Sequence, residues 1–238
     1  MDRFRIARVF ALHNAPDIEF GRIHLRPGPI MAAVDEFYIK LRGKGGHAGY
    51  PHTAIDPIPA LLQIGQALQA IPARRVDPMA SAVVSLTMLR AGEATNVIPE
   101  EVTLAGTVRT LDDTLRSQIA EDIKKIAEAS ADAHHCTAEV EYDWGYPVTS
   151  NDPEEAAFAA RAAADVVGSE RVNANCPPEM GAEDFSYMLQ ERPGAYVLLG
   201  TGPGAFCHNP AFNYNDDASP IGASWFVRLA ETALPLAR

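Results

Sequence analysis

The order of periodic segments between residues 35 and 146 constrains the fold of this chain more than any other feature. Phe37, Ile39 and Leu41 alternate with polar residues, which is typical of a strand with one buried face. The segment predicts strand, helix, strand, strand, helix and strand, over about 37–41, 55–71, 82–89, 102–109, 112–126 and 140–144. This is the order of a ferredoxin-like split βαβ unit, so we expect one inserted α+β domain at 35–146.

The residues on either side of this insert predict a second domain. A short apolar strand covers 8–12, ahead of the insert. After the insert come an alanine-rich helix at 154–167, a strand at 195–199 and a last helix at 218–234. Alternation of strands and helices favours an α/β architecture. We therefore predict an α/β core in two parts, 1–34 and 147–238, interrupted by the smaller domain.

Composition and charge limit the kinds of partner that the chain can bind. Of its 238 residues 47% are hydrophobic, which excludes a disordered chain. The chain has 20 Lys and Arg and 31 Asp and Glu residues. A net charge of -11 has the wrong sign for binding nucleic acid or an anionic membrane. Glycines and prolines interrupt the longest uncharged run, 193–215, so we expect no membrane span. The start lacks a signal peptide and the three cysteines are scattered, so we expect a cytoplasmic protein.

Two histidines share a setting that suits metal binding. His13 and His208 each follow an apolar strand, at the start of a loop, and each precedes an Asn and a nearby Pro. Sites of α/β proteins gather beyond the carboxyl ends of strands, and imidazole is a common metal ligand. The two side chains could therefore converge on one ion. The alternative is that each is a hydrogen-bonded loop histidine.

A glycine-rich loop, Gly43 to His47, follows the first strand of the insert. It lacks the spacing of a phosphate-binding loop, and no helix begins directly after it. The glycines place the imidazole of His47 at a strand tip, where it could reach a ligand or another chain. The alternative is a glycine-rich turn with an incidental histidine.

Two further side chains, Asn96 and Arg109, could bind a substrate. Asn96 lies in the turn between two paired strands and Arg109 on the polar face of the second strand, so hairpin pairing could bring them together. A guanidinium binds a carboxylate through two hydrogen bonds, and an Asn amide can donate to an oxyanion. A turn-forming Asn and a solvated Arg are the alternative. Glu183, with Asp184, is explained most simply as a first-turn carboxylate of a helix at 185–190.

Six short motifs, taken in order, resemble those of the dinuclear-metal amidohydrolases. They are His13-Asn14-Ala15-Pro16, Gly43 to Pro51, Asn96-Val97-Ile98-Pro99, Gly106-Thr107-Val108-Arg109-Thr110, Gly181-Ala182-Glu183-Asp184-Phe185 and His208-Asn209-Pro210. This family includes hippurate hydrolases, N-acyl-amino-acid amidohydrolases and indoleacetyl-amino-acid hydrolases. One motif alone would be weak evidence, but six with compatible spacing over nearly the whole chain are specific.

The resemblance implies a fold, a chemistry and a set of roles. It implies a zinc-peptidase-like catalytic domain with an inserted lid, through which two copies form a homodimer. By resemblance His13 and His208 bind divalent metal, two Zn or Mn ions per site in the intact family, and His47 stabilises the tetrahedral intermediate in the partner subunit's site. Asn96 and Arg109 match lid positions that bind the substrate, a small N-acyl amino acid, and Glu183 matches a position near it.

One departure from the family affects the expected activity. Family members carry, ahead of the segment that contains His13, a Cys-x-Gly-His-Asp stretch and a Glu-Glu pair that supply the other ligands and the general base. Neither precedes His13 here. We therefore expect a C-terminal portion of such an enzyme that is inactive, or nearly so, by itself. Three functions stay open: a metal-dependent amidohydrolase, a non-catalytic dimerisation or binding module, and a related dipeptidase or carboxypeptidase.

Overall fold

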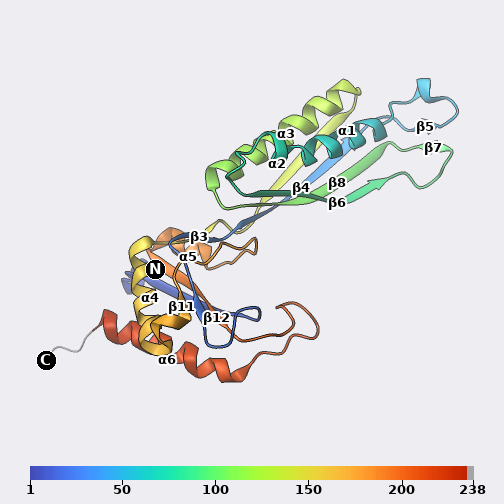
Figure 1. The fold of residues 1–238 in the computed structure, drawn as a ribbon. Coiled ribbons are helices and arrows are strands. Elements are labelled where there is room, and N and C mark those ends of the chain that lie inside the picture. Colours follow the sequence, from blue (N-terminus) through green and yellow to red (C-terminus); the bar gives the residue numbers. More distant parts are fainter. Residues whose placement is uncertain (235–238) are drawn as a thin grey trace. The chain divides into compact units, whose positions relative to one another are not determined.

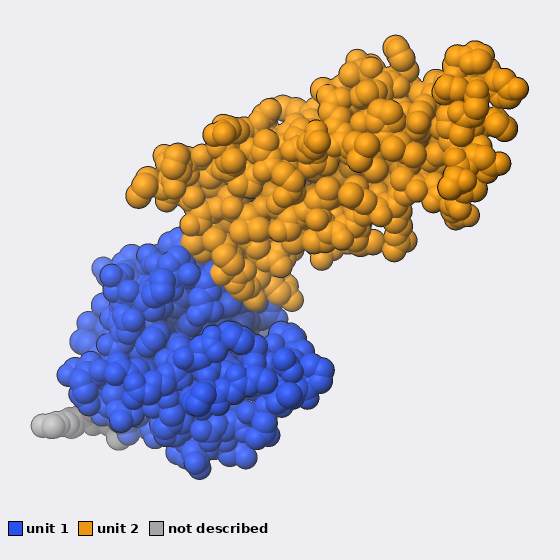
Figure 2. All heavy atoms as spheres, turned by 45° about the vertical axis from the view of Figure 1, so that its right-hand side comes forward, with its two compact units in different colours: residues 1–31, 149–179, 183–238 blue, residues 32–148, 180–182 orange. Residues whose placement is uncertain are grey.

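The structure is a computed structural model that describes residues 1–234. These residues form two compact units, which Figure 2 colours separately. Unit 1 comprises Met1–Met31, Thr149–Glu179 and the chain from Glu183 onward, and unit 2 comprises Ala32–Val148 and Met180–Ala182. The short second piece of unit 2 was not expected from the sequence. The amide of Ala32 donates a hydrogen bond to the carbonyl of Gly181 (2.8 Å), which ties this piece to the start of the insert.

Unit 2 is a four-stranded antiparallel sheet with helices over one face (Figure 1). Along the chain its elements are β4 (Ala33–Arg42), β5 (Gly46–His47), α1 (Ile58–Gln69), α2 (Ile71–Arg74), β6 (Ala82–Ala91), β7 (Val97–Ile98), β8 (Glu101–Thr110), α3 (Asp113–Ala133) and β9 (Thr137–Trp144). The long strands lie in the order β6-β8-β4-β9. Apart from the short β5 and β7 and the division into α1 and α2, the order of elements is the one that the sequence predicts.

The alternation in β4 determines which face of this sheet receives the helices. Phe37, Ile39 and Leu41 are at most 1% exposed, whereas Glu36 and Tyr38, at alternate positions, are exposed. The buried set packs in one cluster with apolar side chains of α1 and α3, among them Leu61, Ile64, Leu68, Ile119 and Ile123. Burial of each such side chain contributes about 1.5–3 kcal/mol, so a register shift by one residue is strongly disfavoured.

Acidic side chains lie at the starts of α1 and α3. α1 begins at Ile58, three residues later than the predicted 55, with Pro57 at its N-cap, and the Asp56 carboxylate accepts from the amide of Ile58 (2.9 Å). α1 ends at Gln69, and Pro72 lies in the first turn of α2, where a proline is tolerated because the missing amide has no helical partner. The Asp112 carboxylate accepts from the amide of Leu115 (2.7 Å), which confirms the predicted acidic start of α3.

Unit 1 contains a four-stranded sheet in the order β1-β12-β2-β11. Its elements are β1 (Val9–Ala15), β2 (Ile23–His24), β3 (Gly28–Met31), β10 (Thr149–Asn151), α4 (Pro153–Val167), β11 (Val172–Asn173), α5 (Ser186–Glu191), β12 (Gly194–Gly200) and α6 (Ser219–Ala233). α4 and α6 contribute to an apolar cluster around the fully buried Trp225. In the described part of the chain no helix is long and apolar enough to cross a membrane.

Two features of unit 1 bear on the site and on the insert. The predicted strand at 8–12 extends to Ala15 because β1 pairs with β12 along its whole length, so His13 lies inside the strand and not in the loop after it. β3 and β10, the strands before and after unit 2, pair with each other, and Met31 lies opposite Thr149.

A buried carboxylate links several elements of unit 2. Asp35 is 1% exposed, and its carboxylate accepts hydrogen bonds from Nε of Arg116 in α3 (2.9 Å), the hydroxyl of Tyr142 in β9 (2.9 Å) and the amide of Gly145 (3.1 Å). The Arg116 guanidinium also lies 5.0 Å from the ring centre of Trp144. Burial, and then the Asp35 charge, raise the pKa of Tyr142, so its hydroxyl remains a donor. The buried ion pair is thus both neutralised and hydrogen-bonded.

Replacing Arg116 by methionine leaves the Asp35 carboxylate buried without its cationic partner. We expect Arg116→Met to lower the free energy of unfolding by about 3–5 kcal/mol, measured by urea denaturation. Arg75→Met is the matched control, because Arg75 pairs with Asp122 of α3 (2.6 Å) but is 51% exposed. It should lower the free energy by about 1 kcal/mol or less. Equal losses in the two variants would contradict the role given to the buried pair.

Candidate functional site

The six predicted site residues fall into two groups. Unit 1 carries His13, Glu183 and His208, and unit 2 carries His47, Asn96 and Arg109. Among the residues that the structure describes, no three His, Cys, Asp or Glu side chains form a group that could hold a metal ion. Neither group is therefore a complete metal site made from described residues.

The tautomer of His13 is set by its own strand. Nδ1 of His13 lies 2.7 Å from the carbonyl oxygen of Asn14. Because a carbonyl only accepts, Nδ1 carries the proton and the lone pair of the neutral ring is on Nε2. Histidines that ligate metals through Nε2 are commonly held in this way, with the other nitrogen donating to a carbonyl or carboxylate. His13 is therefore prepared to donate its Nε2 lone pair.

The loop that carries His208 is anchored beside β1. Nδ2 of Asn14 lies 3.4 Å from Sγ of Cys207, a contact between residues 193 positions apart. It brings the residue after His13 next to the residue before His208. His208 itself is exposed and has a φ of 69°, in the left-handed region that non-glycine residues seldom adopt. The loop thus has a tertiary contact with β1 beside a residue whose backbone conformation is unusual.

Glu183 is joined to the buried strand β12. The hydroxyl of Tyr196 donates to Oε2 of Glu183 (2.9 Å), and the amide of Phe185 donates weakly to Oε1 (3.4 Å). The Tyr196 ring is 2% exposed, and its centre lies 6.3 Å from that of His13. Burial, and then the Glu183 charge, raise the pKa of Tyr196. Glu183 is thus oriented by a tyrosine that also contacts His13.

Two neighbours of His13 were not identified in the sequence. Tyr196 contacts the His13 ring, and its signal is a hydroxyl inside the otherwise apolar strand at 195–199. Glu179 is the second: partial burial and then the charge of Asp17 raise its pKa, whereas His13 lowers it. Nothing in the sequence around Glu179 distinguishes it from other loop carboxylates.

In unit 2 the structure brings His47 and Asn96 together. The short strands β5 and β7 pair so that His47 lies opposite Val97, and the amide of Ala48 donates to the carbonyl of Asn96 (3.0 Å). His47, Asn96 and Val97 are all exposed. We call residues 43–52 with 96–98 the tip of unit 2. The tip presents an imidazole and a carboxamide side chain from two segments that lie far apart in the sequence.

The prediction that hairpin pairing brings Asn96 and Arg109 together is wrong. Arg109 lies opposite Val83 in the β6–β8 pair, whereas the turn that contains Asn96 follows Ala91, which lies opposite Val102. Arg109 is seven positions after Val102 along the strand, or about 23 Å at the usual rise per residue. Val108 faces the helices, so Arg109 lies on the open face of the sheet. The length of the hairpin places the two side chains at its opposite ends.

Groups in its own strand accept only some of the hydrogen bonds that the Arg109 guanidinium can donate. Its Nη1 donates to the carbonyl of Val108 (3.1 Å) and to the hydroxyl of Thr107. Partial burial lowers the pKa of Arg109, an effect that the nearby Asp35 and Glu36 charges oppose. An arginine remains charged under all ordinary conditions, so this half-buried cation can receive an anionic group.

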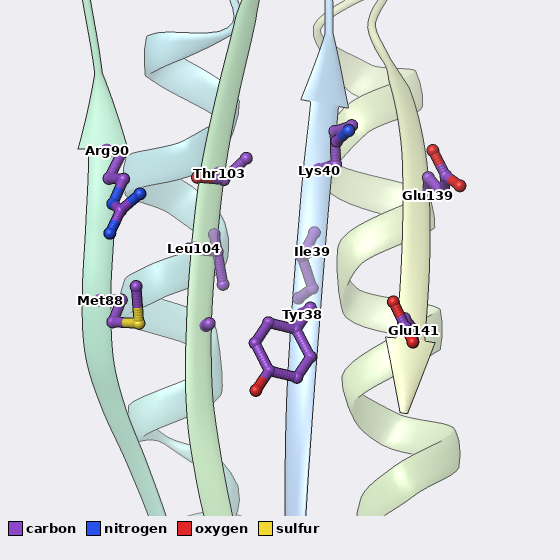
Figure 3. A pocket seen from close by; sticks show the side chains of 10 residues that line it. Tyr38, Ile39, Lys40, Met88, Arg90, Thr103, Leu104, Glu139 and Glu141 are labelled. Atoms are coloured by element: carbon purple, nitrogen blue, oxygen red, sulfur yellow. The ribbon is translucent and has the colours of Figure 1, made fainter. Parts of the chain in front are cut away.

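A hollow of about 330 Å³ lies elsewhere on the open face of the sheet (Figure 3). Tyr38 and Lys40 of β4, Met88 and Arg90 of β6, and Glu139 and Glu141 of β9 line it. None of the six predicted site residues is among its lining residues. Side chains of both charges line the hollow, so it favours neither an anionic nor a cationic ligand.

Comparison with known proteins shows the family of the chain. Residues 1–232 match peptidase family M20/M25/M40. The N-acetylcysteine deacetylase of Bacillus subtilis is 37% identical over 96% of this chain and 60% of its own length, and the hippurate hydrolase of Campylobacter jejuni is 34% identical over the same shares. The crystal structure of the YXEP protein of Bacillus subtilis, described as a dinuclear metal binding peptidase from the M20 family, matches 98% of this chain and 58% of that protein at 32% identity, with a TM-score of 0.79.

The chain belongs to peptidase family M20/M25/M40. It has the mixed α/β fold of that family, as the similarity to the YXEP protein shows. It spans about 60% of the length of the two enzymes named above.

The raised pKa of Tyr196 predicts a loss of stability at high pH. The unfolded chain releases the tyrosine proton above about pH 10 while the folded protein retains it, so the stabilising contribution is complete below pH 10 and declines above it. Tyr196→Phe should reduce the loss of unfolding free energy between pH 10 and 11 by about 1 kcal/mol, measured by urea denaturation. Tyr50→Phe, at a 61% exposed position, is the control and should leave this loss unchanged. An unchanged loss in Tyr196→Phe would contradict the prediction.

Proposed function

We propose that this chain forms part of a metal-dependent amidohydrolase that cleaves the amide bond of N-acyl amino acids. The single observation that supports it most is the tautomer of His13, which leaves a lone pair on Nε2, in a strand whose next residue, Asn14, contacts Cys207 beside His208. Membership of the M20/M25/M40 family supports the hydrolytic chemistry. The names of the deacetylase and the hippurate hydrolase support an acylated amino acid as the substrate class.

In this proposal His13 and His208 are ligands of a divalent metal site, with Zn²⁺ or Mn²⁺ as the metal. Two neutral imidazoles are suitable donors for either ion. They are too few for a catalytic site, and the described residues hold no group of three such donors. The remaining ligands therefore come from another segment or another chain. When bound, the metal supplies Lewis acidity to polarise the scissile carbonyl.

The other site residues are proposed to bind and orient the substrate. Arg109 offers a half-buried guanidinium to the α-carboxylate of an N-acyl amino acid. His47 and Asn96 stabilise the oxyanion that forms at the scissile carbonyl, from the tip of a second copy. Glu183, held by Tyr196, lies close to the bound substrate in this scheme.

We propose that two copies associate through unit 2. The strand order leaves β6 and β9 at the two edges of the sheet, and β6 exposes Met88 and Leu89. An exposed edge strand with apolar side chains is a surface on which a second copy can add its own strand. A homodimer of this kind is consistent with a site that takes His47 from the partner subunit.

A non-catalytic dimerisation or binding module is the second candidate. The observation that favours it is the absence, among the described residues, of a group of three metal-binding side chains. In this case unit 2 pairs with another copy, and unit 1 binds no catalytic metal. A related peptidase activity is a further candidate, since the YXEP protein is described as a peptidase.

Co-expression distinguishes these candidates. A second chain that supplies the Cys-x-Gly-His-Asp and Glu-Glu segments should restore divalent metal content and hydrolysis of N-acetyl and N-benzoyl amino acids. In that complex His208→Ala should lower kcat/KM at least about 100-fold, because a direct metal ligand is lost. His134→Ala is the control, since the His134 ring bonds to Gln63 in unit 2 (2.8 Å). A complex that binds no metal and hydrolyses neither substrate would exclude the amidohydrolase and favour the binding module.

Arg109→Gln should separate substrate binding from chemistry in the same complex. Loss of a charge-assisted pair with the substrate carboxylate should raise KM about 10- to 100-fold, with a smaller change in kcat. A substrate whose carboxylate is replaced by a carboxamide should show little difference between the native protein and the variant. Arg90→Gln, on the same open sheet face but in β6, is the matched control. Equal effects on both substrates would show that Arg109 does not bind the carboxylate.

A further inference from the structure

We infer that the backbone amide of Gly49 is a positioning group for His47: it holds the neutral imidazole as the Nε2–H tautomer, so that His47 presents a hydrogen-bond donor and not a base. The catalytic meaning of this inference rests on the proposed function, but the tautomer itself does not. Gly49 is not among the residues to which the proposed function gives a role.

The hydrogen bond that supports the inference can form in one direction only. The amide nitrogen of Gly49 lies 3.0 Å from Nδ1 of His47. An amide N–H can only donate, so Nδ1 must hold a lone pair. The proton of the neutral ring is then on Nε2, on the far side of the imidazole. This is the reverse of His13, where a carbonyl places the proton on Nδ1.

Further contacts in the loop fix the positions of the Gly49 amide and the His47 ring relative to each other. The amide of Tyr50 donates to the carbonyl of His47 (2.8 Å), and that of Ala48 donates across to Asn96 (3.0 Å). The Tyr50 ring lies beside the imidazole, with 5.3 Å between ring centres and 51° between planes. A Cβ at position 49 would lie 3.1 Å from Nδ1 and 3.2 Å from Cε1 of His47. Residue 49 therefore lies against one edge of the ring, and a side chain introduced there would have little room.

The tautomer decides which chemistry His47 can perform. A neutral histidine with its lone pair on the exposed nitrogen could remove a proton from water or substrate. With Nε2–H exposed, it donates a hydrogen bond to a group that carries negative charge. When water adds to an amide carbonyl, the π electron pair moves onto oxygen, and a fixed donor stabilises that oxyanion without transfer of the proton. The geometry thus assigns His47 to charge stabilisation.

Nuclear magnetic resonance of the histidine ring nitrogens tests the inference on the full chain. At about pH 8.5, two units above the ordinary histidine pKa, His47 should show the Nε2–H tautomer, with Nδ1 as a hydrogen-bond acceptor. His47→Gln identifies the signal. Gly49→Pro removes the amide proton and should lower the ratio of the Nε2–H to the Nδ1–H form roughly five- to tenfold, the effect of one hydrogen bond. Gly49→Ala keeps the amide and should retain the native tautomer after a small shift of the ring.

The outcomes separate this inference from the proposed function. A native protein in which the Nδ1–H form predominates overturns the inference whatever the variants do, so a failure of Gly49→Pro to fold does not leave it untested. Equal tautomer ratios in Gly49→Pro and Gly49→Ala also overturn it. If the tautomer is as expected but the co-expressed complex hydrolyses no N-acyl amino acid, the inference holds and the proposed function fails. In an active complex, Gly49→Pro should lower kcat more than it changes KM, and Gly49→Ala should change neither strongly.

Discussion

A carboxylate on the apolar face of a strand must find a cation and several donors before the sheet around it can close, because an unpaired charge in such a position costs several kcal/mol. In unit 2 this carboxylate is Asp35 of β4. The partners that satisfy it come from α3 and β9, through Arg116 and Tyr142, and the Thr107 hydroxyl of β8 donates to its backbone carbonyl (2.8 Å). One residue thus joins three strands and a helix, at the end of the sheet where Arg109 lies.

The two histidines with defined tautomers show how the main chain can assign chemistry to identical side chains. At His13 a carbonyl accepts from Nδ1, and the free nitrogen is a lone-pair donor. At His47 an amide donates to Nδ1, and the free nitrogen carries a proton. Both contacts are local, within two residues along the chain, so the strand and the loop that carry them set the tautomer directly. In each case a backbone group, and not a charged side chain, makes the contact that sets the tautomer.

Much of the fold could be predicted from the sequence because its signals are local. The alternation of Phe37, Ile39 and Leu41 and the acidic cap at Asp112 each depend on residues a few positions away. The buried pair could have been anticipated: Asp35 occupies the apolar phase of β4, and Arg116 shares a helix face with Ile119 and Ile123. A charge on each of two buried faces implies that the two charges meet.

The candidate site could be predicted less completely, because it depends on register and on contacts over long distances. The six motifs indicate candidate site residues, but not that the β6–β8 hairpin separates Asn96 from Arg109. That Tyr196 and Glu179 are neighbours of His13 follows only from the tertiary structure, which brings β12 and the loop before α5 close to that histidine. The role inferred for the Gly49 amide could not be predicted from the sequence, because nearly every residue type has a backbone amide and the residue type does not show what that amide binds.

The pairing of β3 with β10 has a consequence for engineering of the chain. Met31 and Thr149 are opposite one another in that pair, so the polypeptide leaves unit 1 and returns to it at almost the same point. An insertion with adjacent ends can be exchanged for another module, or reduced to a short turn, without rerouting the strands of its host. The bond between Ala32 and Gly181 would then need a substitute. Unit 2 is in this sense an exchangeable insertion, and a chimaera could retain unit 1 and carry a different inserted domain in place of unit 2.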